Sequence, residues 1–271
     1  MVQKALFILI SIILLCHSIY ADEKKDLFSA VKSNDPKLAI QLIKDGADVN
    51  EIDETGQSPL HHACYLGYLE IINLLVNNGA AVNKTVPKLV LTPLHGATMN
   101  GNRSIVALLV DRGADINARD SEGATPIFAA CWIGAIDTVK YLISKGARFD
   151  VKTNYGTTPF HYACQSNNLE LVDFLIKNGC SVNNQAQNGA TPLHMAVARG
   201  KIPIVELLIK NGAKAKYKMK WDSELSFNLK APILKDEDIM VIKFLRGQTA
   251  LDIAIKSGNE QLIKIINNSI L

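Results

Sequence analysis

Apolar residues recur in this chain in short blocks that have the spacing of an amphipathic helix. Residues 120–152 show the pattern most clearly. A turn at Asp120–Gly123 precedes one apolar block, and Gly134 separates that block from a second one, which ends at Gly146. Apolar positions three and four residues apart form one face of a helix, and glycine commonly ends a helix because it tolerates a left-handed backbone. The pattern predicts a turn followed by two short antiparallel helices.

The same block returns at a nearly constant interval. A Ser-Pro or Thr-Pro pair, which favours a helix start, opens the first helix of five units, and the prolines are 34, 33, 33 and 33 residues apart: Pro59, Pro93, Pro126, Pro159 and Pro192. A Gly-Ala or Gly-Cys pair follows the second helix in the same register, at Gly46, Gly79, Gly113, Gly146, Gly179 and Gly212. Units of this size cannot bury their own apolar faces, so the period predicts a row of stacked helix pairs.

These motifs resemble the ankyrin repeat. Residues 53–85 and 120–152 follow the family's order of an acidic turn with glycine, Thr-Pro-Leu-His, a leucine pair and Gly-Ala-Asp-Val-Asn nearly throughout. The resemblance implies an all-α ankyrin-repeat solenoid of about seven units including caps, in which helix-turn-helix units are joined by β-hairpin-like loops. It also implies that the first helices and the loop tips form a concave face that binds other proteins.

The period divides the chain into a leader, an array and one insertion. We expect a signal peptide at 1–21 and a repeat domain at 22–271. The domain then consists of an amino-terminal cap at 26–52, repeats at 53–85, 86–119, 120–152, 153–185 and 186–217, an insert at 218–241 and a capping repeat at 242–271.

Two segments depart from the repeat pattern. Val86–Leu91 replaces the acidic turn of its repeat and is one residue longer, so we expect a deformed and unusually apolar hairpin there. The insert follows from the 58-residue spacing between Leu193 and Leu251, which exceeds the usual period by about 25 residues. A long loop in a compact array is usually either functional or disordered.

The first 21 residues have the layout of a secretory signal peptide. A basic start precedes Ala5–Cys16, which contains no charge, and the more polar segment after it ends on the small residue Ala21. We expect cleavage after Ala21 and export to the periplasm or out of the cell. The apolar run is shorter than the ~20 residues that span a membrane, so no stable membrane insertion is expected after cleavage. The alternative is an anchor formed by uncleaved residues 5–20.

Charge and motif content argue against nucleic acid binding and catalysis. The 271 residues include 29 basic and 26 acidic side chains, and the net charge of +3 is too balanced to indicate nucleic acid. The sequence contains neither a phosphate-binding glycine loop nor the G-x-S-x-G, H-E-x-x-H and C-x-x-C motifs. We therefore expect no enzyme activity and no cofactor, and the insert is the one plausible place for an unrecognised active site.

The repeated histidines are better explained by packing than by metal binding. They occur once per repeat, at His61, His95, His161 and His194. Stacked helices lie ~8–10 Å apart, whereas zinc ligands converge to about 2 Å from one point, so no metal site is expected. The resemblance implies that each histidine hydrogen-bonds the backbone of the turn.

The cysteines of the array are interpreted as small buried hydrophobic residues. Cys64, Cys131 and Cys164 share one repeat position, and equivalent positions in stacked units lie too far apart for a disulfide. Cys180 replaces the alanine of the Gly-Ala pair. A Cys164–Cys180 disulfide within one repeat is the alternative.

The resemblance places partner contacts at the two residues before each first-helix glycine and at the loop tips. These positions are apolar or aromatic in the first three repeats and small or polar in the last two. Exposed aromatic and methionine side chains mark interfaces. The candidate partner-binding residues are Tyr65, Leu66, Leu89, Met99, Trp132, Ile133 and Tyr155. The alternative is that these side chains pack on neighbouring repeats.

Together these features predict an exported, monomeric scaffold that binds an unidentified protein without making or breaking a bond. Two other roles fit the same sequence: an accessory or inhibitor of an exported enzyme, and a secreted effector that acts on host proteins.

Overall fold

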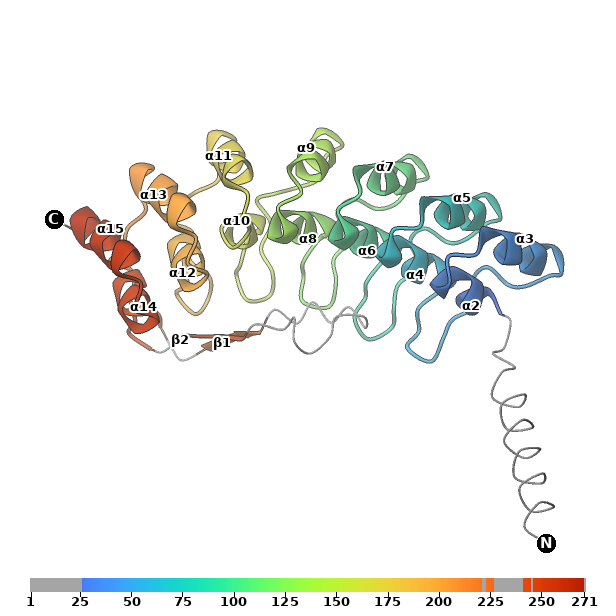
Figure 1. Ribbon diagram of the computed structural model, residues 1–271, viewed down its shortest axis with the longest axis horizontal. Coiled ribbons are helices and arrows are strands. Elements are labelled where there is room, and N and C mark those ends of the chain that lie inside the picture. Colours follow the sequence, from blue (N-terminus) through green and yellow to red (C-terminus); the bar gives the residue numbers. More distant parts are fainter. Residues whose placement is uncertain (1–25, 221–222, 227–240, 245, 271) are drawn as a thin grey trace, which may run out of the picture. The chain divides into compact units, whose positions relative to one another are not determined.

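The computed structural model describes residues 26–220, 223–226, 241–244 and 246–270. The chain divides into two compact units, Met1–Ala81 and Val82–Leu271, and Figure 1 shows the helices of each unit arranged in pairs. The predicted signal peptide, 1–21, and its alternative as an anchor, 5–20, lie outside the described residues.

The described part of unit 1, residues 26–81, contains two helix pairs. Its helices are α2 (Leu27–Lys32), α3 (Pro36–Lys44), α4 (Pro59–Leu66) and α5 (Leu69–Asn77). Each pair packs internally, α2 on α3 and α4 on α5, and the pairs stack through α2 on α4 and α3 on α5. The described helices of unit 1 therefore form two helix pairs stacked on each other.

Within its described residues, unit 2 contains five helix pairs. Its helices are α6 (Pro93–Asn100), α7 (Arg103–Asp111), α8 (Pro126–Ile133), α9 (Ile136–Ser144), α10 (Pro159–Ala163), α11 (Leu169–Lys177), α12 (Pro192–Ala198), α13 (Ile202–Lys210), α14 (Ala250–Ser257) and α15 (Glu260–Ile270). The first helices pack in sequence order, from α6 through α8, α10 and α12 to α14. The second helices form the other row, where α7 contacts α9, and α13 contacts both α11 and α15 (Figure 1). The predicted all-α repeat fold is confirmed.

Small residues allow the first helices to stack closely. Each first helix carries a fully buried alanine at the same repeat position, at Ala63, Ala97, Ala130, Ala163 and Ala196. The next position is also fully or almost fully buried, and it is occupied by Cys64, Thr98, Cys131, Cys164 and Val197. The core is therefore a narrow band along the row, because each helix pair contributes apolar surface mainly to its neighbours.

Asparagine side chains join successive repeats on the second-helix side. In unit 2, the Nδ2 group of Asn83 donates to the carbonyl oxygen of Gly113 at 2.9 Å, and its Oδ1 atom accepts from the backbone N–H of Asp115 at 2.8 Å. The same two bonds are made by Asn50 in unit 1 and by Asn117 and Asn183 in unit 2. We call this pair of bonds the asparagine clasp. It satisfies the backbone carbonyl of the glycine that follows the second helix.

The insertion lies within the loop of the last repeat. In a regular repeat, the N–H of Asp120 donates to the carbonyl oxygen of Ala124, and the N–H of Gly123 donates to that of Asp120. In the last repeat, the N–H of Met219 donates to the carbonyl oxygen of Gln248, and the N–H of Gly247 donates to that of Met219, each at 2.9 Å. Residues 220–246 therefore take the place of the two residues 121–122. The segment 220–246 overlaps the predicted insert at 218–241.

The inserted segment begins as an antiparallel ribbon. Strands β1 (Ser223–Ser226) and β2 (Val241–Phe244) pair so that Ser223 lies opposite Phe244 and Ser226 opposite Val241. At its base, Met219 is buried in a cluster with Ala186, Ala190 and Met195. The base of the insertion is thus part of the packed array.

Candidate functional site

Three first helices of unit 2, α6, α10 and α12, begin with the same threonine and histidine pair. The backbone N–H of Thr158 donates to Nδ1 of His161 at 3.2 Å, and the Thr158 hydroxyl lies 2.9 Å from the same nitrogen. Because Nδ1 accepts, the proton of the neutral ring is on Nε2, which lies 3.4 Å from the carbonyl oxygen of Ala190 in the next loop. His95 makes the equivalent contacts with Thr92 and Ala124. The expected hydrogen bonding of these histidines to the turn backbone is confirmed.

The loops of unit 2 are joined tip to tip by backbone hydrogen bonds. In each bond, the backbone N–H of one loop donates to a carbonyl oxygen of the preceding loop, at 2.8–2.9 Å. The donor and acceptor residues are Ser121 and Leu89, Asn154 and Glu122, Gln187 and Tyr155, and Lys220 and Asn188. Side-chain bonds from Asn154 to Ser121 and from Gln187 to Asn154 reinforce the ladder. The loop tips are therefore held in fixed relative positions without a partner.

We call the first helices α6, α8, α10 and α12, together with the loops at 86–91, 120–124, 153–157 and 186–190, the finger face of unit 2. Figure 1 shows these loops extending from the row of first helices, away from the row of second helices. The finger face carries five of the seven candidate partner-binding residues. The other two, Tyr65 and Leu66, lie in the last turn of α4 in unit 1.

None of the seven candidate residues is buried. Tyr65, Leu66, Leu89, Met99 and Trp132 are half-buried. Ile133, at the end of α8, is 39 % exposed, and Tyr155, at a loop tip, is 56 % exposed. The equivalent residues after α10, Gln165 and Ser166, are buried. The seven remain predictions, with side chains positioned to offer apolar surface to a partner.

One further apolar residue of the finger face was not among the sequence-based candidates. Val90 is 39 % exposed and has a φ of +55°. It occupies the place of Gly123, because its N–H bonds to the carbonyl oxygen of Val86 as that of Gly123 bonds to Asp120. A β-branched residue at positive φ is strained by roughly 1–3 kcal/mol, and such strain concentrates at functional sites. The signal in the sequence was the missing glycine in this one loop.

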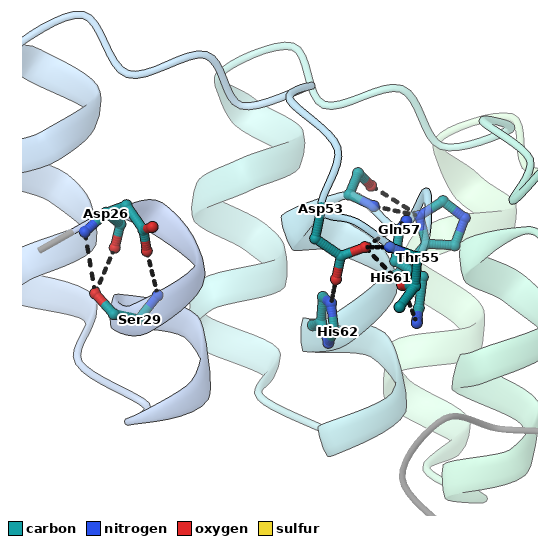
Figure 2. A network of polar contacts seen from close by, with 8 residues as sticks. Asp26, Ser29, Asp53, Thr55, Gln57, His61 and His62 are labelled. Atoms are coloured by element: carbon teal, nitrogen blue, oxygen red, sulfur yellow. Dashed lines mark hydrogen bonds and ion pairs between the residues drawn. The ribbon is translucent and has the colours of Figure 1, made fainter. Parts of the chain in front are cut away.

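The corresponding loop of unit 1 is held by a carboxylate (Figure 2). Asp53 accepts hydrogen bonds from the backbone N–H groups of Thr55 and Gln57 and from the Thr55 hydroxyl, and its second oxygen lies 2.7 Å from Nε2 of His62. Burial alone would raise the pKa of Asp53, but these hydrogen bonds outweigh it and lower the pKa to about 2. The carboxylate is therefore ionised at neutral pH and serves to fix the turn. A cavity of about 540 Å³ beside it is lined by Asp26, Phe28, Lys32, Glu51, Ile52, Asp53, Glu54 and Thr55.

The cysteines of the array have the environment of structural residues. Cys64, Cys131 and Cys164 are fully buried and Cys180 is partly buried, and all four are free thiols. The predicted packing role is consistent with this, and the alternative Cys164–Cys180 disulfide is not formed. Burial raises the pKa of each thiol, to about 12 for Cys180. A thiol must ionise to act as a nucleophile, so these positions are poorly suited to nucleophilic chemistry.

The described residues provide neither a cluster of metal ligands nor a helix that could span a membrane. Across 26–220 and 246–270, no three His, Cys, Asp or Glu side chains are grouped closely enough to hold a metal ion. In the same part of the chain, none of the helices combines the length and the apolar character needed to cross a bilayer.

Comparison with known families identifies the repeats. A family model described as ankyrin repeats (3 copies) matches residues 27–120, 94–186, 127–219 and 180–269. Among solved structures, the human ASB11 ankyrin repeat domain is similar with a TM-score of 0.70 and 25 % identity, covering 90 % of this chain and 96 % of that one.

Curated proteins are similar over short stretches. Mouse protein phosphatase 1 regulatory subunit 27 is 44 % identical over 54 residues, which are 20 % of this chain and 35 % of the relative. Mouse 2-5A-dependent ribonuclease is 38 % identical over 60 residues, which are 22 % of this chain and 8 % of the relative. The matches therefore span well under half of these relatives, and they correspond to the length of one or two repeats.

Proposed function

Because this chain belongs to the ankyrin repeat family, we propose that it is a scaffold that binds a protein partner through the finger face of unit 2 and performs no catalysis. The observation that carries the proposal is the set of half-buried and exposed apolar side chains beside a hydrogen-bonded row of loop tips. A pre-formed surface loses little conformational entropy on binding, so a modest apolar contact area gives useful affinity.

The relatives favour a partner that is itself an enzyme. One of them is named as a regulatory subunit of protein phosphatase 1, and a scaffold that performs no catalysis would act on an enzyme by occupying its surface. A role as accessory or inhibitor of one enzyme is therefore the second candidate function. Co-purification of this chain with a single enzyme in equal molar amounts would distinguish this role from that of a general adaptor.

We further propose that residues 1–21 direct the chain to export, so that binding takes place outside the cytoplasm. The basis is the sequence of the leader. Amino-terminal sequencing of the protein from the exported fraction should find Asp22 as the first residue. A chain that retains residues 5–20 and sediments with membranes would instead support the anchor, and a full-length chain in the cytoplasm would contradict export.

Trp132 provides the test of the finger face. The partner would be captured from the exported fraction, identified by mass spectrometry and purified, and its affinity for variants measured by calorimetry. Trp132→Ala should weaken binding by about 30-fold, the effect of losing an interface anchor worth about 2 kcal/mol. Lys210→Ala on α13 is the matched control and should bind as the wild type does.

The fold of each variant decides how the result is interpreted. Circular dichroism should show unchanged helical content for Trp132→Ala, because the side chain is only half-buried. Equal loss of helix and binding would place Trp132 in the core. Unchanged affinity in a folded Trp132→Ala variant would remove it from the interface.

A further inference from the structure

A cavity that is open to solvent lies on the second helices of unit 2, outside the finger face. It has a volume of about 520 Å³ and lies against α7 and α9, which are in contact. Its lining residues are Arg103, Asp137, Lys140, Tyr141 and Ser144. Three of the five carry side-chain donors that can face a bound anion, the guanidinium, the ammonium and the phenol.

Two lining residues break the repeat pattern of their own helices. Arg103 opens α7, whereas the other second helices of the full repeats open with an aliphatic residue: Leu69, Ile136, Leu169 and Ile202. Tyr141 stands at the first position of the leucine pair, where the equivalent residues are Leu74, Leu108, Phe174 and Leu207. The other full repeats have neither an arginine nor a tyrosine at these positions, and the first position is exposed at Leu69 (38 %) and Leu169 (43 %), so packing does not account for Arg103.

The two exceptional residues are in contact with each other. The guanidinium carbon of Arg103 lies 4.9 Å from the centroid of the Tyr141 ring, and Nζ of Lys145 lies 5.6 Å from that centroid. The hydroxyl oxygen of Tyr141 is buried and has no hydrogen-bond partner among the described residues. A buried hydroxyl without a partner costs roughly 1–3 kcal/mol, which a ligand that accepts its hydrogen bond would recover.

The remaining charges around the cavity are partly compensated. Lys140 forms an ion pair with Glu170 at 3.1 Å, Lys145 forms one with Asp111 at 3.6 Å, and Asp137 lies in the first turn of α9. Ser144 donates its hydroxyl proton to the carbonyl oxygen of Tyr141 at 2.7 Å. Within the described residues, Arg103 has no carboxylate partner and its charge is available to a ligand.

We propose that this cavity binds a carboxylate of a protein partner, with Arg103 and the Tyr141 hydroxyl as donors and Lys140 as a supporting charge. A guanidinium and a carboxylate match as a planar two-point pair. The lining residues sum to one positive charge, from Arg103 and Lys140 against Asp137, and this favours a monoanion over doubly charged phosphate. The site lies on the second helices, so its failure would leave the finger-face proposal intact.

Titration with a capped hexaglutamate peptide tests the proposal, with the tyrosine ring carbons of the protein labelled for NMR. At low ionic strength, where exposed charges are least screened, the peptide should shift the Tyr141 signal, which is assigned by its absence in Tyr141→Phe. Arg103→Leu restores the aliphatic residue found at Leu69 and Leu169, and it should weaken binding at least about tenfold. Tyr141→Phe should weaken binding about threefold to tenfold.

The controls separate this site from general attraction to a basic surface. Lys210→Leu on α13 removes a cation elsewhere and should change the affinity less than about twofold, and hexaglutamine should not bind. Thermal melting of each variant shows that it is folded. The proposal would be overturned if hexaglutamate bound the wild type and both site variants equally. It would also be overturned if hexaglutamine bound the wild type as well as hexaglutamate does. Tighter binding of inorganic phosphate than of the peptide would overturn the choice of a carboxylate.

Discussion

At the scale of the residue, one side chain decides whether the threonine before each first helix has a partner. The Thr158 hydroxyl forms a hydrogen bond with Nδ1 of His161. After Thr125, the position of that histidine is occupied by Phe128. Phe128 is buried and meets the Tyr162 ring edge-on at 5.4 Å. The Thr125 hydroxyl is consequently buried without a partner.

The first prediction compares the same substitution at these two threonines. Thr125→Val removes an unsatisfied hydroxyl and should leave stability unchanged or raise it by up to about 1 kcal/mol, whereas Thr158→Val breaks a buried network and should cost about 1–2 kcal/mol. Urea denaturation of both variants measures the difference. Equal costs at the two sites would show that the histidine contributes nothing through this hydroxyl.

The second prediction concerns the strained valine. Val90→Gly should raise the free energy of unfolding by about 1 kcal/mol, because glycine adopts the positive φ of this turn without steric cost. Gly123→Val is the reciprocal control and should destabilise, since the φ of +81° at this position strains a β-branched residue. If Val90→Gly lowered stability instead, the packing of the valine side chain would outweigh the strain.

The third prediction follows from the buried histidines His161 and His194. Burial lowers the pKa of each to about 4, although nearby backbone carbonyls act in the opposite direction. The unfolded chain therefore takes up protons below pH 6.5 that the folded chain does not, and stability is lost as the pH falls from 6.5 towards 4.

The expected loss is on the order of 2 kcal/mol per histidine near about pH 5. Asp53 does not contribute in this pH range, because folding lowers its pKa from 3.8 to about 2 and both values lie below the range. Urea denaturation above and below pH 6.5 checks the effect, and His161→Asn should reduce the loss. A stability that stays constant over this range would contradict the neutral, buried state of both rings.

At the scale of the element, the asparagine clasp is missing at one joint. The clasp position of repeat 120–152 is Asp150, and a carboxylate can accept a hydrogen bond but cannot donate one. Among the described residues, Asp150 contacts Arg148 at 3.4 Å, and no bond to Gly179 replaces the clasp. The joint between this repeat and the next thus has fewer connecting hydrogen bonds than the joints made by Asn117 and Asn183.

The fourth prediction is that Asp150→Asn stabilises unit 2. Two new hydrogen bonds across the joint should add about 1 kcal/mol to the free energy of unfolding. Asn117→Asp, which breaks an existing clasp, should have the opposite sign and serves as the matched control. Thermal and urea denaturation of both variants measure the effect. A destabilised Asp150→Asn variant would mean that the Arg148 contact matters more than the clasp.

At the scale of the whole molecule, the repeat period in the sequence predicted the features that every repeat shares. It did not predict the local contacts that differ from one repeat to another. The helix pairs, their glycine ends and the stacked alanines follow from a pattern that repeats every 33 residues. Val90 in a glycine position and the unpartnered Thr125 hydroxyl depend on contacts that no periodicity reveals. The insertion was visible as an altered spacing, but only the bonds of Met219 locate it within a loop.

The same distinction applies to the candidate surfaces. Family resemblance indicated the finger-face residues, because they precede a first-helix glycine or lie at a loop tip, and the exposure of Ile133 and Tyr155 is compatible with that role. The cavity on α7 and α9 escaped sequence analysis, because Arg103 and Tyr141 are 38 residues apart and become neighbours only when the second helices pack.

The central claim is that the finger face of unit 2 holds the protein partner of the scaffold. Site-specific photo-crosslinking tests it most directly, with a benzophenone side chain placed at Tyr155 on a loop tip or at Lys210 on α13. We predict that a partner captured from the exported fraction is crosslinked from position 155 and not from position 210. Crosslinking from position 210 alone would contradict the account.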